Sequence, residues 1–175
     1  MATYALTGVP GTGKTTVAAL LAETFEVLEA NELAEELGAI VGEDEERGAS
    51  IVDEDVLSTE APHALDGRQV LVEGGLAHFF APDAVVVLRC HPDALRERLN
   101  ARDWPEAKVE ENVMAETLDA ITSEVAAEVA WEIDTTETPP EEVARLTAAL
   151  FKGETVTHPA VHPLGGVDWT ATLMG

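Results

Sequence analysis

The stretch that decides the fold is GVPGTGKT at residues 8–15, which follows a short strand-like run at residues 3–7. It matches the pattern G-x-x-x-x-G-K-[ST], in which backbone N–H groups of a glycine-rich loop cradle phosphates at the start of a helix. Residues 15–24 carry apolar side chains at helical spacing, which predicts that helix. Strand, loop and helix together are the context that this motif requires, so a chance glycine turn is disfavoured.

Each position of the loop has a predicted task. We expect Lys14 to reach the β- and γ-phosphates of ATP as a catalytic residue, and the hydroxyl of Thr15 to ligate Mg²⁺. ATP and Mg²⁺ are therefore the cofactors that the motif implies. The other phosphate contacts are expected from the rest of the loop: Gly8, Pro10, Gly11, Thr12, Gly13 and Thr16.

The composition indicates one α/β domain with a tail. The chain has 175 residues, of which 46% are hydrophobic, and no run is long enough for a membrane span. The N-terminus lacks the charged start of a signal peptide, so we expect a cytoplasmic location and no membrane partner. The single cysteine, Cys90, excludes a disulfide framework within the chain and follows a hydrophobic run, which favours a structural role.

The charge is strongly acidic, with 34 acidic against 10 basic residues and a net charge of −24. The acids are spread along the whole chain, which favours a surface adapted to multimolar salt, where repulsion is screened. An acidic face for a basic partner is the alternative. A groove that binds nucleic acid directly is disfavoured, because such sites need clustered lysine and arginine.

Alternating strand and helix patterns predict a parallel sheet with helices on both faces, the α/β architecture of a P-loop NTPase. After the loop helix, the predicted strands are 26–30, 69–73, 84–88 and 131–134, with an extended segment at 50–53. The predicted helices are 32–37 (capped by Asn31), 55–65, 92–101, 106–129 and 140–150. Residues 42–48 are expected to form a charged loop. The tail, 152–175, shows no periodicity, and we expect it to be packed on the surface through Trp169 or partly disordered.

Further candidate residues follow from the ends of strands and the spacing of cations. Glu73 ends a buried strand and is expected to hold Mg²⁺ directly or through water; an ordinary strand-end carboxylate is the alternative. Arg98 and Arg102 share a helix face and are expected to clamp the transferring phosphate, with Arg89 a weaker candidate. The alternative role for Arg98 and Arg102 is ion pairing at the surface with nearby acidic residues.

Three features have no single interpretation from the sequence. The acidic run at residues 53–55 is either a helix cap with solvated charge or a group that positions an acceptor or Mg²⁺. His78 is favoured as a buried or capping histidine, although it could reach the site after Glu73. The pair His158 and His162 is weak support for a metal.

The chain resembles the adenylate kinase isoenzyme 6 family in its archaeal form. The resemblance is carried by GVPGTGKTT (8–16), IVDEDVL (51–57), VLVEGGLAHFF (70–80), VVVLRCHPDALRERLNARDW (85–104) and KVEENVMAE (108–116). It implies a nucleoside monophosphate kinase-like fold in residues 1–150, with a monophosphate-binding insertion at about 32–64, a lid at about 102–109 and a separate tail at 151–175. It also implies phosphate transfer from ATP to AMP, ATPase activity, and a role in maturation of the small ribosomal subunit through a platform ribosomal protein and pre-rRNA.

The chain departs from the family pattern at two places. The usual aspartate and histidine of the second acidic motif are Glu73 and Gly75 here, and the usual RGY of the lid is the sequence RDW at 102–104. Trp104 is expected to stack in place of the tyrosine. We expect an ATP-dependent AMP kinase; the alternatives are a ribosome-assembly ATPase with incidental kinase activity and a P-loop kinase of another small metabolite.

Overall fold

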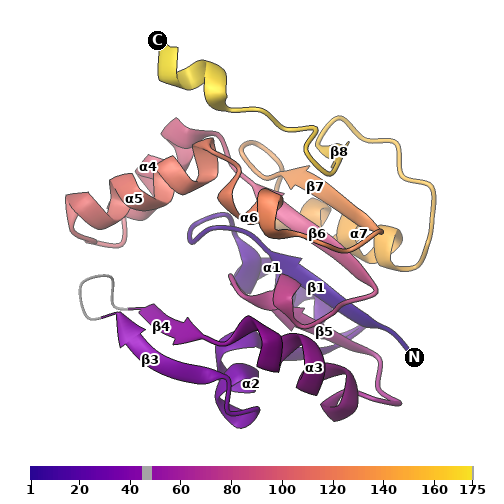
Figure 1. Ribbon diagram of the computed structural model, residues 1–175. Coiled ribbons are helices and arrows are strands. Elements are labelled where there is room, and N and C mark those ends of the chain that lie inside the picture. Colours follow the sequence, from indigo (N-terminus) through magenta and orange to yellow (C-terminus); the bar gives the residue numbers. More distant parts are fainter. Residues whose placement is uncertain (45–48, 175) are drawn as a thin grey trace.

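The computed structural model describes residues 1–44 and 49–174 and is built around one six-stranded sheet (Figure 1). The strands lie in the order β2-β5-β1-β6-β7-β8, and all pairs are parallel except β7 with β8. Their bounds are β1 Thr3–Thr7, β2 Glu26–Glu29, β5 Val70–Glu73, β6 Ala84–Arg89, β7 Ala130–Asp134 and β8 Val161–Pro163. The predicted parallel sheet is confirmed.

Helices cover both faces of this sheet, also as predicted. One face packs against α1 (Lys14–Leu21) and α7 (Pro140–Phe151), where Tyr4 stacks on Phe151 at 4.6 Å between ring centroids. The other face packs against α2 (Ala30–Glu36) and α3 (Glu54–Ala64). The α2 helix is capped by the Glu29 carboxylate rather than by Asn31, because Glu29 accepts the backbone N–H of Glu32 at 2.8 Å.

Two further units lie beyond the carboxyl ends of the strands. Helices α4 (Pro92–Asn100) and α5 (Glu106–Thr117) bury Leu95 and Leu99 against Val9 of the glycine loop. An antiparallel hairpin, β3 (Ile40–Asp44) with β4 (Ala49–Val52), stands opposite them. The expected charged loop at 42–48 is therefore wrong for residues 42–44, which belong to β3, and its remainder lies outside the described residues.

The single helix expected at 106–129 is wrong. The structure has α5, then Asp119 in the left-handed conformation (φ 55°), then α6 (Ala120–Glu124). The cause is tertiary: the carbonyl of Glu116 accepts a hydrogen bond from Arg89 Nη2 at 3.1 Å, and the Asp119 carboxylate accepts another from the same nitrogen. The helix path is thus bent around a buried arginine.

The tail is ordered, and part of it completes the sheet. Strand β8 pairs antiparallel with β7, which the sequence did not indicate. Beyond it, Trp169 packs edge-on against His91 and donates its indole N–H to Glu116 Oε1 at 3.1 Å, so packing through Trp169 is confirmed. Short 3₁₀ turns occur at η1 (Ala77–Phe79) and η2 (Thr170–Met174). Among the described residues, no helix has the length and apolar character needed to cross a membrane.

Arg89 is the centre of a buried ionic cluster, and its expected role in clamping phosphate is therefore wrong. The side chain is 1% exposed and forms ion pairs with Glu116, Asp119 and Glu132. Burial lowers the pKa of Arg89, but the neighbouring carboxylates outweigh that effect and raise it, so the guanidinium stays charged. The backbone N–H of Val167 completes the cluster by donating to Glu132 Oε2 at 2.8 Å.

We predict that Arg89→Met destabilises the fold by about 3–5 kcal/mol, because it leaves Glu116 and Glu132 buried without their cation. The matched control is Arg96→Met, which removes half-exposed ion pairs with Glu110 and Asp93 and should cost about 1 kcal/mol or less. Urea unfolding at a fixed high KCl concentration measures both. Equal losses for the two variants would contradict the central role of Arg89.

Candidate functional site

The glycine loop adopts a conformation that only glycine tolerates at its key positions. Gly8 has φ +142°, and a Cβ there would lie 2.6 Å from the carbonyl oxygen of Leu88. Gly11 has φ +91°, and its Cβ would meet Leu95 at 2.8 Å. The loop is therefore pressed between β6 and α4, which fixes its backbone for contact with a ligand.

Lys14 begins α1 and folds back over the loop, where its Nζ donates to the carbonyl of Val9 at 2.9 Å. The pKa of Lys14 is lowered to about 8, because burial lowers it most, Glu73 partly offsets that effect and Arg102 adds to it. A polyphosphate beside this amine would favour the protonated form. Lys14 is therefore suited to bind an anion that arrives from solvent.

Glu73 ends β5 and is 9% exposed, and its register places it beside Leu6 of β1 and Glu29 of β2. Burial raises the pKa of Glu73, and Lys14 opposes that effect. The Glu73 side chain lines a cavity beside the glycine loop. An oxygen donor of this kind suits Mg²⁺, and the Thr15 hydroxyl lines the same cavity, so the residues present fit that ion.

These residues enclose a cavity of about 270 Å³, which we call the phosphate cavity. Its lining consists of the loop and the strand ends: Pro10, Gly11, Gly13, Lys14, Thr15, Thr16, Glu29, Asn31, Glu73, Gly74, Gly75 and Arg102. Sequence reasoning missed Glu29 and Asn31. The available signal was their position at the carboxyl end of a predicted strand, the edge at which Glu73 also lies.

The two predicted arginines have different surroundings. Arg98 holds the loop to the segment after β7, since its guanidinium donates to the carbonyls of Gly11 at 3.4 Å, Thr135 at 2.7 Å and Thr136 at 3.2 Å. Arg102 is exposed and lines the phosphate cavity. Its guanidinium carbon lies 5.5 Å from the ring centroid of Trp104. Arg98 is thus engaged with the protein, whereas Arg102 faces the cavity.

A second cavity of about 350 Å³, the Thr135 cavity, lies on one side of the loop. It shares Gly11, Gly13, Thr16 and Arg102 with the phosphate cavity, so the two spaces adjoin. The rest of its lining comes from the loop, α1, α4, the segment after β7 and the start of α7: Thr12, Val17, Arg98, Thr135, Thr138, Pro140 and Val143. It is a mainly neutral space beside the loop.

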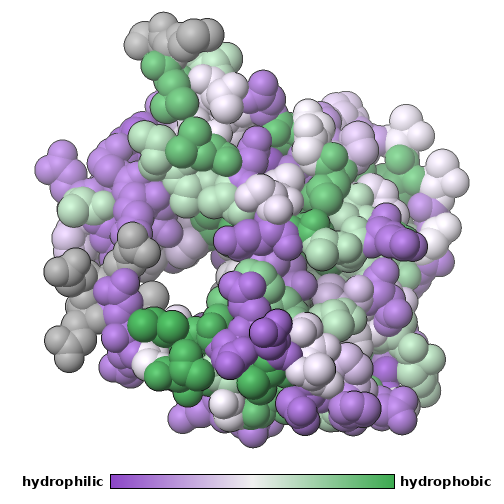
Figure 2. Space-filling view, in the orientation of Figure 1, coloured by the Kyte–Doolittle hydropathy of each residue, from purple (hydrophilic) through white to green (hydrophobic). Residues whose placement is uncertain are grey.

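A third cavity of about 600 Å³, the Trp104 cavity, lies on the opposite side. It shares Pro10, Asn31 and Gly75 with the phosphate cavity, and the hollow between hairpin and α5 is visible in Figure 2. Its other lining residues are Ser50, Leu76, Trp104, Lys108, Glu111, Asn112 and Ala115. The Lys108 ammonium lies 4.3 Å from the Trp104 ring centroid, which places a cation against an aromatic face.

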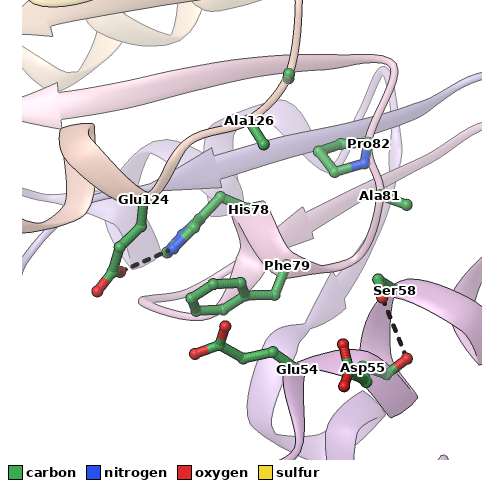
Figure 3. A pocket seen from close by; sticks show the side chains of 10 residues that line it. Glu54, Asp55, Ser58, His78, Phe79, Ala81, Pro82, Glu124 and Ala126 are labelled. Atoms are coloured by element: carbon green, nitrogen blue, oxygen red, sulfur yellow. Dashed lines mark hydrogen bonds and ion pairs between the residues drawn. The ribbon is translucent and has the colours of Figure 1, made fainter.

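The remaining candidates lie away from these spaces. Asp53 caps α3 by accepting the N–H groups of Asp55 and Val56, both at 3.1 Å, so its carboxylate acts as a helix cap. His78 lines a separate cavity of about 500 Å³ with Glu54, Phe79 and Glu124 (Figure 3). Within the described residues, no three His, Cys, Asp or Glu side chains form a metal-ligating group, which leaves no such cluster around His158 and His162.

Comparison with known proteins gives a consistent picture. Residues 5–119 match the family model described as AAA domain. The chain is 45% identical over 173 residues to "Putative adenylate kinase" of Archaeoglobus fulgidus, covering 97% of this chain and 92% of the relative. It is 44% identical over 174 residues to the protein of that name from Natronomonas pharaonis, covering 97% and 98%.

Solved structures of lower identity share the fold alone. A sugar kinase from Janibacter matches with a TM-score of 0.59 and 20% identity, covering 90% of this chain and 99% of its own. Shikimate kinase from Acinetobacter baumannii matches with a TM-score of 0.57 and 21% identity, covering 90% and 96%. These likenesses support the P-loop kinase architecture.

We predict that nucleotide binding takes up a proton near pH 8.5. Lys14 is protonated below its pKa of about 8 and loses its charge above it, so affinity for a non-hydrolysable ATP analogue should fall roughly tenfold per pH unit above that value. Calorimetry in buffers of different ionisation enthalpy measures the proton count. Lys14→Arg, which stays charged, should lose this pH slope; the same slope in both proteins would contradict the assignment.

Proposed function

We propose that this chain, which belongs to the family of these archaeal putative adenylate kinases, transfers the terminal phosphoryl group of ATP to AMP. The observation that carries the proposal is the arrangement of three adjoining cavities, with the phosphate cavity between two larger ones. A kinase of a nucleoside monophosphate needs this layout, because two nucleotides must meet with their phosphates in the middle.

The donor occupies the Thr135 cavity and the phosphate cavity. Its phosphates lie in the loop of residues 8–16, with Lys14 on the β- and γ-phosphates, and its nucleoside lies between Arg98 and Pro140. Thr15 and Glu73 are the residues that would hold Mg²⁺, which supplies charge neutralisation on the phosphates when bound.

The acceptor occupies the Trp104 cavity. The indole of Trp104 gives a flat surface for a base, and Lys108 beside it attracts the monophosphate. Asn31 and Gly75 line both this cavity and the phosphate cavity, so they border the path between the acceptor and the donor.

In the transfer, an oxygen of the AMP phosphate forms a bond to the terminal phosphorus of ATP, and the bond from that phosphorus to the bridging oxygen breaks. Two molecules of ADP result. Lys14 and Arg102 stabilise the charge that spreads over the transferring oxygens, and Arg98 holds the loop in place. Water that enters in place of AMP gives ATPase activity.

Closure of two chain segments around the nucleotides belongs to the same proposal. The monophosphate-binding insertion is about residues 32–64, which contain most of α2, the strands of the hairpin and α3. The lid is about residues 102–109, which run from the end of α4 into the first turn of α5. Residues 1–150 form the kinase domain and 151–175 a tail that covers the Arg89 cluster. Movement of insertion and lid excludes water before transfer.

A second candidate is a ribosome-assembly ATPase whose nucleotide state controls release of a small-subunit ribosomal protein bound to pre-rRNA. The net charge of −24 favours it, because an acidic surface attracts a basic client. The same charge also suits a surface in multimolar salt, as expected for a protein of a halophile. Capture of the purified platform protein at high KCl, with ATP against ADP, tests this candidate.

We predict that Lys14→Ala abolishes turnover, because the β- and γ-phosphates lose their cation. The assay is product analysis with Mg-ATP in multimolar KCl, with and without AMP. Two ADP formed per AMP consumed supports the kinase. ADP with free phosphate, indifferent to AMP, would contradict it and favour the assembly ATPase, while another acceptor from a panel would indicate a different metabolite kinase.

We predict that Trp104→Leu raises the KM for AMP by about tenfold, the loss expected when a base loses an aromatic stacking partner. The KM for ATP is the internal control and should change little, because Trp104 does not line the Thr135 cavity. Initial rates over a grid of both nucleotides give the two constants. A rise in both constants would argue against an acceptor site at Trp104.

A further inference from the structure

His78 connects the base of the glycine loop to a cavity on another side of the molecule. The residue lies in η1, is 7% exposed, and forms a wall of the cavity that also contains Glu54 and Phe79. Its Nε2 lies 3.1 Å from Glu124 Oε2, the contact drawn in Figure 3. Its Nδ1 lies 3.1 Å from the hydroxyl oxygen of Thr7.

Thr7 is fully buried at the end of β1, directly before Gly8 of the loop. Its hydroxyl oxygen also lies 3.4 Å from the carbonyl oxygen of Gly75. Gly75 lines both the phosphate cavity and the Trp104 cavity. A single buried hydroxyl thus lies between His78 and the segment that borders both nucleotide spaces.

The hydroxyl of Thr7 has one proton and two acceptors within reach. If it donates to Gly75, Nδ1 must carry the ring proton, and Nε2 then presents a lone pair to the Glu124 carboxylate. If it donates to Nδ1, the ring proton lies on Nε2 and is donated to Glu124. Only the second arrangement satisfies a neutral imidazole beside an ionised carboxylate, and in it the Gly75 carbonyl receives no hydrogen bond from Thr7.

Burial of the ring favours this neutral form, whereas the neighbouring carboxylates oppose it. Glu54 and Asp55 of α3 and Glu124 of α6 are acidic residues that line the same cavity, and Thr7 of β1 is uncharged. Burial lowers the pKa of His78 to about 4, although Glu54 opposes the shift. At neutral pH the ring therefore holds one proton, which lies on Nε2 and is donated in a hydrogen bond to Glu124.

We infer that His78 is a positioning residue that turns the Thr7 hydroxyl away from Gly75 and so sets the gap between the glycine loop and the Gly74-Gly75 segment. Without the ring acceptor, the Thr7 hydroxyl donates to the Gly75 carbonyl and draws that segment toward β1. Gly74 packs closely against α2, since a Cβ added at Gly74 would lie 2.9 Å from the Cβ of Ala30. The Gly74 backbone therefore has little room to move and offset this displacement of the segment. This inference rests on the proposed phosphoryl transfer.

Two pairs of variants test the inference. In His78→Asn, the side-chain amide reaches the position of Nδ1 and keeps an acceptor for the Thr7 hydroxyl. In His78→Gln, the amide reaches the position of Nε2 and keeps only the contact with Glu124. Both lose the ring contact with Phe79, whose centroid lies 4.1 Å away, so their loss of thermal stability should be similar. Thr7→Val removes the hydroxyl, and Thr7→Ser keeps it.

His78→Gln should lower kcat by about tenfold, the value of one well-placed hydrogen bond, with little change in the KM for ATP. His78→Asn and Thr7→Ser should keep most of the wild-type kcat. Adding Thr7→Val to His78→Gln removes the hydroxyl that would draw Gly75 toward β1, so the double variant should be faster than His78→Gln alone. Equal kcat for His78→Gln and His78→Asn, a double variant no faster than His78→Gln, or losses of kcat that only follow the losses of Tm would overturn the inference. If the wild-type chain phosphorylated no acceptor, the proposed function would be wrong. The His78 and Thr7 variants would then be compared by their rates of ATP hydrolysis, which tests the inference separately.

Discussion

The pairing of Arg89 with three carboxylates is the constraint on which the rest of the structure depends. The guanidinium lies at the carboxyl end of β6, and its partners come from α5, from the turn before α6 and from β7. Because a buried cation must keep its partners, these elements cannot shift independently. The cluster therefore fixes α5, and with it α4, above the glycine loop, which lies between them and β6.

The nucleotide spaces follow from that placement. Arg98 on α4 binds the carbonyls of Gly11 and of the segment after β7, so the loop is held from two directions. Thr135 reinforces this contact, since its hydroxyl lies 2.9 Å from the carbonyls of both Thr12 and Arg89. Binding groups are thus aligned by structure that exists before ligand arrives, which reduces the cost of ordering them on binding.

Features that depend on neighbours in sequence were predictable, whereas features that depend on distant partners were not. The glycine loop, the alternation of the parallel strands β1, β2, β5, β6 and β7 with helices, and the position of Glu73 at a strand end follow from local pattern. The break at Asp119 does not, because the sequence there lacks glycine and proline and the cause lies at Arg89. Arg89 and Arg102 look alike in sequence; only burial separates a structural cation from one that faces a cavity.

The tail has a consequence for local opening of this chain. Val167 and Trp169 supply N–H donors to the buried carboxylates of Glu132 and Glu116. If the tail detached from the sheet, these carboxylates would lose two donors while they stayed buried, and burial of an unpartnered polar group is costly. Local opening of the tail is therefore coupled to the Arg89 cluster, and hydrogen exchange at these two N–H groups reports on the integrity of that cluster.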